Sequence, residues 1–125
     1  MQYIGKIDID KFKCVSNDII TDEVIITDER IQHIRERHPN DYERFSKYIP
    51  QILEEPDYII EAAKPKTAVI LKEIIENNEH LQLVVRLKTS DDPEEYKNSI
   101  ITFLKIDKKD WNRLIKNKNI LYKRE

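Results

Sequence analysis

The sequence is poor in residues that several common kinds of site require. Its single cysteine, Cys14, excludes an internal disulfide and a cysteine-rich zinc site. Its single glycine, Gly5, leaves no glycine-rich loop of the kind that holds nucleotide phosphates. No apolar run is long enough to cross a membrane, and the alternating, charged start "MQYIGKIDID" is not typical of a signal peptide. We therefore expect a protein of the reducing cytoplasm.

The composition is that of a small domain with a heavily charged surface. The 125 residues suit one domain, and 39% of them are hydrophobic against 37% charged. The net charge of −2 argues against a protein that coats nucleic acid nonspecifically. The basic residues gather at the C-terminus, where residues 105–125 carry eight of them against three acidic residues. Such a run is usually a solvated helix face, although a local basic surface can also bind phosphates.

The order of the predicted elements favours an α+β fold. Thr27 or Asp28 can begin a helix that ends at His38, because Pro39 disfavours helical geometry in the residue before it. A second helical segment covers about 41–54, with Pro50 able to kink or divide it, and a third covers about 107–117. Apolar alternation predicts short strands at "YIGKIDI", "EVIIT", "DYIIEA", "KTAVILKEII", "HLQLVVRLKT", "NSIITFLKI" and "NILYKRE". The pattern predicts helices packed on one face of a twisted sheet.

Polar residues on two of these strands mark one sheet face. In "LQLVVRLK", Arg86 alternates away from the core-facing leucines, so it lies mid-sheet on the polar face. In "NSIITFLK", Ser99 and Thr102 point to opposite faces unless a bulge intervenes. Alternation alone leaves open which hydroxyl lies beside Arg86, and a solvent-facing arginine is the ordinary alternative.

The stretch "RIQHIRERHPND" carries two histidines whose directions differ. On a helical wheel His38 falls near the apolar Ile31 and Ile34, whereas His33 lies on the far side with Arg30 and Arg37. The spacing HxxxxH is not that of the zinc-binding HExxH motif, and no metal site or cofactor is expected. A histidine on an apolar helix face is usually structural, so the residues alone do not favour catalysis by His38.

Four blocks of the sequence together resemble a known family. The blocks "ITDERIQHIRERHPNDY", "VVRL", "NSIITF" and "ILYKRE" are similar to the phage barnase–EndoU–colicin–RelE-like nucleases of phages, prophages and toxin systems. The resemblance runs from about residue 20 to the C-terminus, which makes residues 1–20 a candidate N-terminal extension of a single domain. It implies N-terminal helices packed against one face of an antiparallel sheet of four or five strands.

The resemblance also implies an activity and its residues. It implies a metal-independent RNA endonuclease in which the 2′-OH attacks the phosphodiester and leaves a 2′,3′-cyclic phosphate and a 5′-hydroxyl. A histidine would act as general acid or base, while Arg and Lys would stabilise the phosphate charge. The residues that match the family's positions, or that its last block offers, are His38, His33, Arg86, Thr102, Ser99, Tyr122 and Lys123. RNA is the expected substrate, and an immunity or antitoxin protein the expected partner. The alternative is a non-catalytic RNA- or protein-binding domain of a phage protein.

Overall fold

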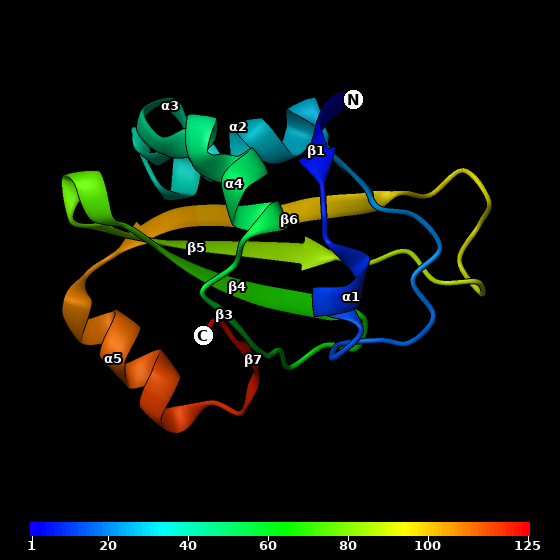
Figure 1. The fold of residues 1–125 in the computed structure, drawn as a ribbon. Helices are drawn as coiled ribbons and strands as arrows, with labels where there is room; N and C mark the ends of the chain where they lie inside the picture. The colour runs from blue at the N-terminus through cyan, green and yellow to red at the C-terminus, as the bar shows by residue number, and fades with distance from the viewer.

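The computed structural model describes residues 1–125 and contains one mixed seven-stranded sheet (Figure 1). Its strand order is β1-β2-β6-β5-β4-β3-β7, and every neighbouring pair is antiparallel except β2 and β6. The strands are β1 Gln2–Lys6, β2 Glu23–Ile26, β3 Tyr58–Glu61, β4 Thr67–Ile74, β5 Glu79–Arg86, β6 Asn98–Ile106 and β7 Ile120–Lys123. The α+β class expected from the sequence is confirmed.

The expectation of four or five antiparallel strands was wrong in number and in direction. All seven β-type segments of the sequence are strands, and the short ones β1, β2 and β7 join the same sheet. The sequence of a short segment indicates that it forms a strand, but it does not indicate which strand it pairs with. The pairing depends on tertiary contacts. β2 pairs with β6 in parallel at two positions, and the chain then continues as a helix beside β6. Residues 1–20 supply β1 and the short helix α1 (Ile9–Phe12), whose Phe12 is buried in the main core.

The helix that carries both histidines has the predicted bounds. Helix α2 (Asp28–Arg37) begins after Thr27, whose hydroxyl accepts a hydrogen bond from the Arg30 amide at 3.1 Å. Acidic residues occupy its first turn and basic residues its last, as the helix dipole favours. His38 follows as C-cap with φ −133° and ψ 73°, outside helical geometry, as expected of a residue that precedes proline.

The segment after α2 is divided, as Pro50 suggested. It forms α3 (Asp41–Phe45), a 3₁₀ turn η1 (Ser46–Tyr48) and α4 (Ile49–Glu54). Pro50 lies in the first turn of α4, where its missing N–H group breaks no helical hydrogen bond. The last helix, α5 (Lys108–Asn117), is capped by Asp107, which accepts from the Asp110 amide at 2.7 Å.

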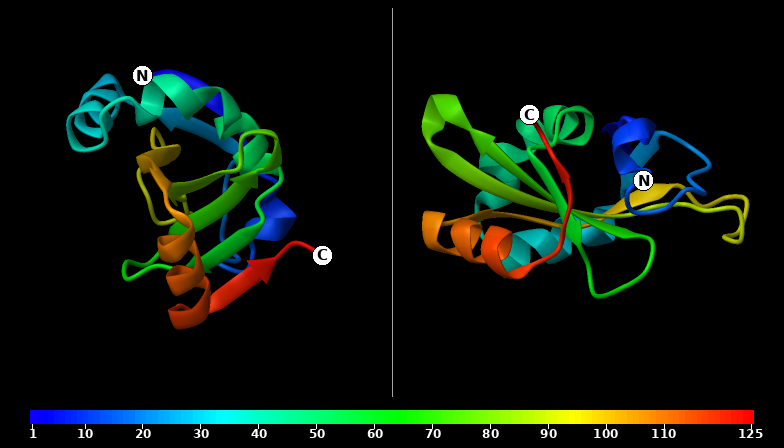
Figure 2. Two further views of the ribbon diagram at one scale, coloured as in Figure 1. Left: turned by 90° about the vertical axis from the view of Figure 1, so that its left-hand side faces the viewer. Right: turned by 60° about the horizontal axis from the view of Figure 1, so that its bottom comes forward.

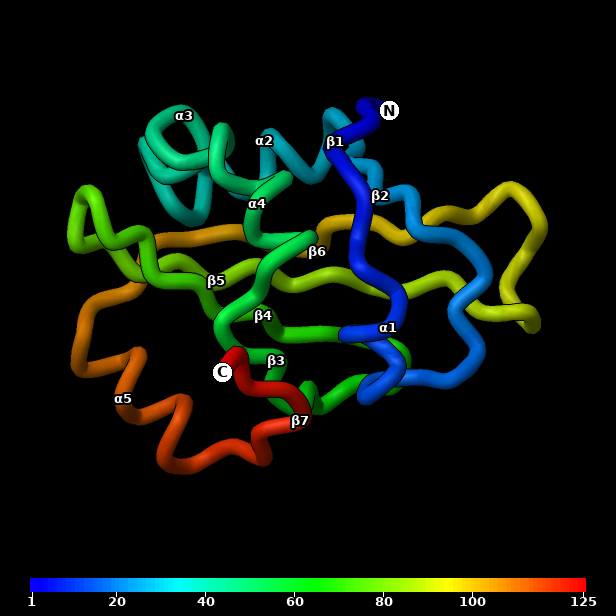
Figure 3. The backbone as a smooth tube through the Cα atoms, in the orientation of Figure 1, coloured from blue at the N-terminus to red at the C-terminus, as the bar shows by residue number.

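Helices lie on both faces of the sheet rather than on one, which corrects the second part of the fold prediction. A main core of 21 buried residues includes α2–α4 residues such as Ile34 and Ile52 and inward-facing strand residues such as Leu83. On the opposite face, Trp111 of α5 packs on Ile60 and Leu71. Figures 1 and 3 show α2, α3 and α4 on one side of the strands and α5 on the other. The helix α5 follows β6, the last long strand, and lies on the other face of the sheet. The order of elements along the sequence does not indicate this change of face.

Candidate active site

The polar side chains of β4, β5 and β6 converge near the end of β5, on the sheet face that α5 shares. Arg86, the last residue of β5, pairs with Thr67 of β4 on one side and with Ser99 of β6 on the other. Side chains of directly opposite residues lie on the same face of a sheet. Arg86, Thr67 and Ser99 therefore form one cross-strand row.

A β-bulge adds Thr102 to this face. The register of β5 and β6 shifts so that Val84 pairs with Thr102 while Val85 pairs with Ile100, which leaves Ile101 as the extra residue. Ile100 and Phe103 are both buried in the main core on the opposite side. Ser99 and Thr102 consequently point to the same face as Arg86. The alternation rule could not give this result, because it holds only for a strand without a bulge.

Arg86 and Thr67 line a basic hollow of about 670 Å³, and Ser99 and Thr102 lie next to it, paired with Arg86 and Val84. Its walls come from α2, the loop between β3 and β4, and the ends of β4, β5 and β6. Four cations line it and no carboxylate does, and the rest of the lining is largely apolar. The lining residues are Arg30, Ala62, Ala63, Lys64, Pro65, Lys66, Thr67, Val84, Arg86 and Ile101. Cations that share a concave surface focus a positive potential into it, which favours an anionic ligand.

The hollow lies on the sheet face that α5 packs on, and α2 contributes Arg30 to it from beside β6. In the left view of Figure 2, α2 lies above this face and α5 below it, and the loop between β3 and β4 projects on the same side. Arg30 reaches the hollow from α2, because Ile31 and Ile34 on the same helix point into the core. The apolar stripe of α2 therefore fixes the direction of Arg30.

Arg86 is held by a carboxylate from the loop between β5 and β6. Its Nη1 donates to Asp92 Oδ2 at 3.0 Å and its Nη2 to Asp92 Oδ1 at 2.9 Å. Nη1 also donates to the Leu87 carbonyl. The hydrogen bonds from Arg86, followed by one from the Thr89 amide, hold the pKa of Asp92 well below its usual range. The same pair raises the pKa of Arg86, so the guanidinium stays charged.

A second cation of the hollow has a looser partner. Lys66 Nζ lies 2.6 Å from Asp91 Oδ1, and this contact is the largest cause that lowers the pKa of Asp91. The Asp91 side chain is 72% exposed, whereas that of Asp92 is 8% exposed. The two neighbouring acids therefore have different surroundings: the Asp92 side chain is buried against Arg86, and Asp91 contacts Lys66 at the surface.

The two histidines of α2 lie at different distances from the hollow. His33 borders a shallow groove on the outer face of α2 that shares Arg30 with the hollow. At ~1.5 Å per residue, His33 is about 4.5 Å further along the helix axis than Arg30, and His38 is about 12 Å further. His38 lies beside the start of α3, whose Asp41 amide donates to its carbonyl at 3.2 Å. Of the two, His33 is nearer to Arg30 along the helix axis.

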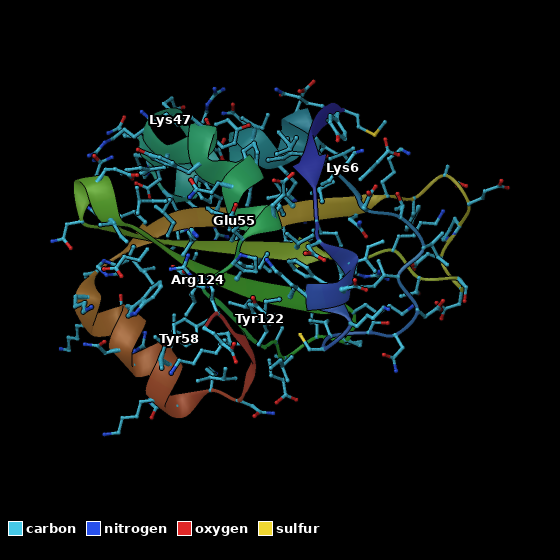
Figure 4. All side chains as sticks on the ribbon, viewed as in Figure 1. Lys6, Lys47, Glu55, Tyr58, Tyr122 and Arg124 are labelled. Carbon is cyan, nitrogen blue, oxygen red and sulfur yellow. The ribbon has the colours of Figure 1, made fainter.

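The C-terminal candidates do not join this group. β7 is the far edge of the sheet, with β4 and β3 between it and β5. Tyr122 packs against the main core, on the face opposite Arg86, and Figure 4 shows it on β7. Lys123 pairs with Tyr58, at the level of Leu71 rather than of Thr67, and is exposed. The structure therefore brings Arg86, Ser99 and Thr102 together, with His33 nearby, and leaves His38, Tyr122 and Lys123 apart from them.

Sequence reasoning missed Arg30, Lys66 and Asp92. Arg30 lies in the quoted histidine stretch, four residues before Ile34, but only the position of α2 at the edge of β6 aims it at the hollow. Asp92 lies in "DDPEE", which looks like a solvated turn. Its burial and its contact with Arg86 depend on the path of the loop between β5 and β6, for which a single sequence contains no signal.

No group of three or more His, Cys, Asp or Glu side chains is arranged to hold a metal ion. No helix combines the length and the apolar character that a membrane span needs.

An α+β domain with four cations around a hollow on its sheet presents a surface that favours an anionic ligand. A family model described as phage-Barnase-EndoU-ColicinE5/D-RelE like nuclease2 matches residues 1–123. The chain belongs to this family. The match also covers residues 1–20, which the sequence blocks left out. No match was found among curated proteins or among solved structures.

Proposed function

We propose that this protein is a metal-independent RNA endonuclease whose active site is the basic hollow. The observation that carries the proposal is a four-cation hollow beside two aligned hydroxyls in a member of a nuclease family. Cations at the rim suit a backbone phosphate, while the apolar floor at Val84 and Ile101 suits the flat face of a ribose or base.

The chemistry uses the 2′-OH of the substrate as nucleophile. A base removes the 2′-OH proton, the 2′-oxygen bonds to phosphorus, and the bond from phosphorus to the 5′-oxygen breaks as an acid gives that oxygen a proton. A 2′,3′-cyclic phosphate and a 5′-hydroxyl result. Arg86 and Arg30 are suited to the charge that builds on the phosphate oxygens, and Ser99 or Thr102 can donate a hydrogen bond to one of them.

A histidine of α2 is the proposed general acid or base, because histidine ordinarily titrates near neutral pH. The proximity of His33 to Arg30 favours it over His38. Tyr122 and Lys123 are less suited to the reaction, because β7 lies at the far edge of the sheet.

The test is cleavage of a short RNA in EDTA, with an all-deoxy strand of the same sequence as control. Cleavage of the RNA alone, with cyclic phosphate ends, is the expected result, because DNA lacks the internal nucleophile. Equal cleavage of both strands would contradict the mechanism. Binding of RNA without cleavage would favour the non-catalytic accessory domain instead.

The rim also suits a protein inhibitor. A nuclease of toxin type needs an immunity or antitoxin partner, and an acidic surface would complement Arg30, Lys64 and Lys66. Charge reversal at Lys64 and Lys66 should then slow association with such an inhibitor, as measured by its rate constant at low salt.

A further inference from the structure

We propose that Asp92 is a positioning residue that turns the two unused N–H groups of Arg86 toward a phosphate in the basic hollow. The proposal rests on the proposed function for the identity of the ligand, whereas its tests measure binding rather than cleavage. Arg86 lines the hollow, whereas Asp92 does not line it and lies in the loop behind Arg86.

The donors of Arg86 are divided between the protein and the hollow. A guanidinium has five N–H bonds in one plane. Three of them are used: two by Nη1, to Asp92 and to the Leu87 carbonyl, and one by Nη2, to Asp92. The N–H of Nε and the second N–H of Nη2 remain. These two bonds point the same way along one edge of the plane, which is the geometry that binds a phosphate through two oxygens.

Asp92 is itself fixed, so it can hold the guanidinium in one orientation. It accepts hydrogen bonds from the Thr89 amide at 2.8 Å and from the Thr89 hydroxyl at 3.2 Å, in addition to both from Arg86. Its side chain is 8% exposed against 33% for Arg86. The carboxylate therefore faces the protein and the free edge of the guanidinium faces solvent.

The charge of Asp92 separates this role from a simple electrostatic one. A carboxylate near a bound phosphate repels it, so its removal by itself strengthens the binding of an anion. Loss of a fixed orientation has the opposite effect, because the guanidinium must then be ordered on binding. Removing the charge of Asp92 should strengthen anion binding if its effect is only electrostatic, and should weaken it if Asp92 positions Arg86.

The first test measures binding of a 2′-O-methyl RNA oligonucleotide, which cannot be cleaved, by fluorescence anisotropy at low salt. We expect Asp92→Asn to weaken binding about tenfold, the size of one charge-assisted hydrogen bond. In the Arg86→Ala background, the same substitution should cause no further loss. The matched control is Asp91→Asn, which removes the 2.6 Å partner of Lys66, leaves Asp92 at 3.9 Å from it, and should leave binding unchanged or tighter. Unchanged or tighter binding by Asp92→Asn, or equal losses in both backgrounds, would overturn the proposal.

A second test begins from a variant that keeps Asp92 and restores the missing group instead. In Arg86→Ala, added guanidinium ion should occupy the place between Asp92 and the Leu87 carbonyl and restore part of the binding. It should not do so in Arg86→Ala combined with Asp92→Asn, and equal rescue in both would overturn the proposal.

The two proposals fail in different ways. A wild-type protein that binds the 2′-O-methyl strand but cleaves no RNA refutes the nuclease function and leaves the Asp92 comparison valid. Cleavage of RNA with tight binding by Asp92→Asn refutes the positioning role alone. A wild-type protein that neither binds the strand nor cleaves RNA refutes both.

Discussion

The polar side chains at the two ends of one sheet face have different surroundings. At the end covered by α5, His80 is 5% exposed, packs edge-on to Trp111 at 4.9 Å between ring centroids, and has its Nε2 3.3 Å from Glu73 Oε2. At the open end, Arg86 is 33% exposed and borders the basic hollow. Both residues lie on β5 with the same alternation, so the covering helix separates a packed polar side chain from one that can meet a ligand.

The same strands can therefore contribute to stability at one end of the sheet and to binding at the other. Trp111 and Leu71 remove apolar area from water at the covered end. At the open end no helix covers Arg86. Its partner is Asp92, from the loop between β5 and β6, and this contact leaves the hollow open. Stability should therefore depend most on one end and RNA cleavage on the other.

The largest expected effect is on stability at the covered end. Trp111→Ala should lower the free energy of unfolding by about 3–5 kcal/mol, because it removes a buried aromatic ring and leaves a cavity. Urea unfolding measures this, and Ile75→Ala, at a side chain that is 76% exposed, is the control with little change. The folded fraction of Trp111→Ala should cleave RNA at the wild-type rate. A loss of cleavage would contradict the separation of stability and catalysis between the two ends.

The next effect is on catalysis at the open end. Arg86→Ala should lower kcat/KM for RNA about 100- to 1,000-fold, the usual loss when one donor to a charged transition state is removed. Arg86→Lys should recover little, because lysine lacks the planar fork. Arg113→Ala on α5 is the matched control, since its side chain is 63% exposed and lies outside the hollow. Equal losses in Arg86→Ala and Arg113→Ala would point to nonspecific charge.

The histidines offer a sharper division within α2. His33→Ala should lower kcat about 100-fold, as expected on losing a general acid or base, and His38→Ala should lower it less. The measurement is the rate against pH from about 5 to 8, where a titrating histidine produces one limb of the profile. Loss of that limb in His38→Ala rather than in His33→Ala would reverse the assignment.

The hydroxyls beside Arg86 should contribute less. Thr102→Val and Ser99→Ala each remove one donor, and the one that contacts the substrate should lower kcat/KM about tenfold. The bulge leaves both on the same face, so the comparison identifies which hydroxyl the reaction uses. No loss in either variant would place the phosphate elsewhere in the hollow.

The smallest effect is a pH dependence of stability. The pKa of Asp92 is lower in the folded protein than in an unfolded chain, so its stabilisation is present above the unfolded value of about 4 and is lost as pH falls. Urea unfolding from about pH 5 to pH 2 should show a shallower decline for Asp92→Asn than for the wild type. Asp10→Asn, at a side chain that is 87% exposed, should follow the wild type.

Local signals predicted most elements, and long-range pairing decided what they missed. The cap at Thr27, the stop at Pro39 and the alternation of "LQLVVRLK" lie within a few residues of the features they determine. The parallel pairing of β2 with β6 joins residues more than 70 positions apart, and the burial of the Asp92 side chain against Arg86 has no local marker. Arg86 and the pair of hydroxyls were within reach of sequence reasoning, whereas Arg30, Lys66 and Asp92 required the fold.

The place of β6 in the sheet sets a condition on how the protein is made. β6 alone connects β1 and β2 to the other strands of the sheet, and it also supplies Ser99 and Thr102. A ribosome must therefore complete residues 98–106 before the sheet can include β2 and before the hollow has its full wall. Synthesis thus delays the appearance of the site, and an interrupted translation product that ends before β6 has no assembled site to act with.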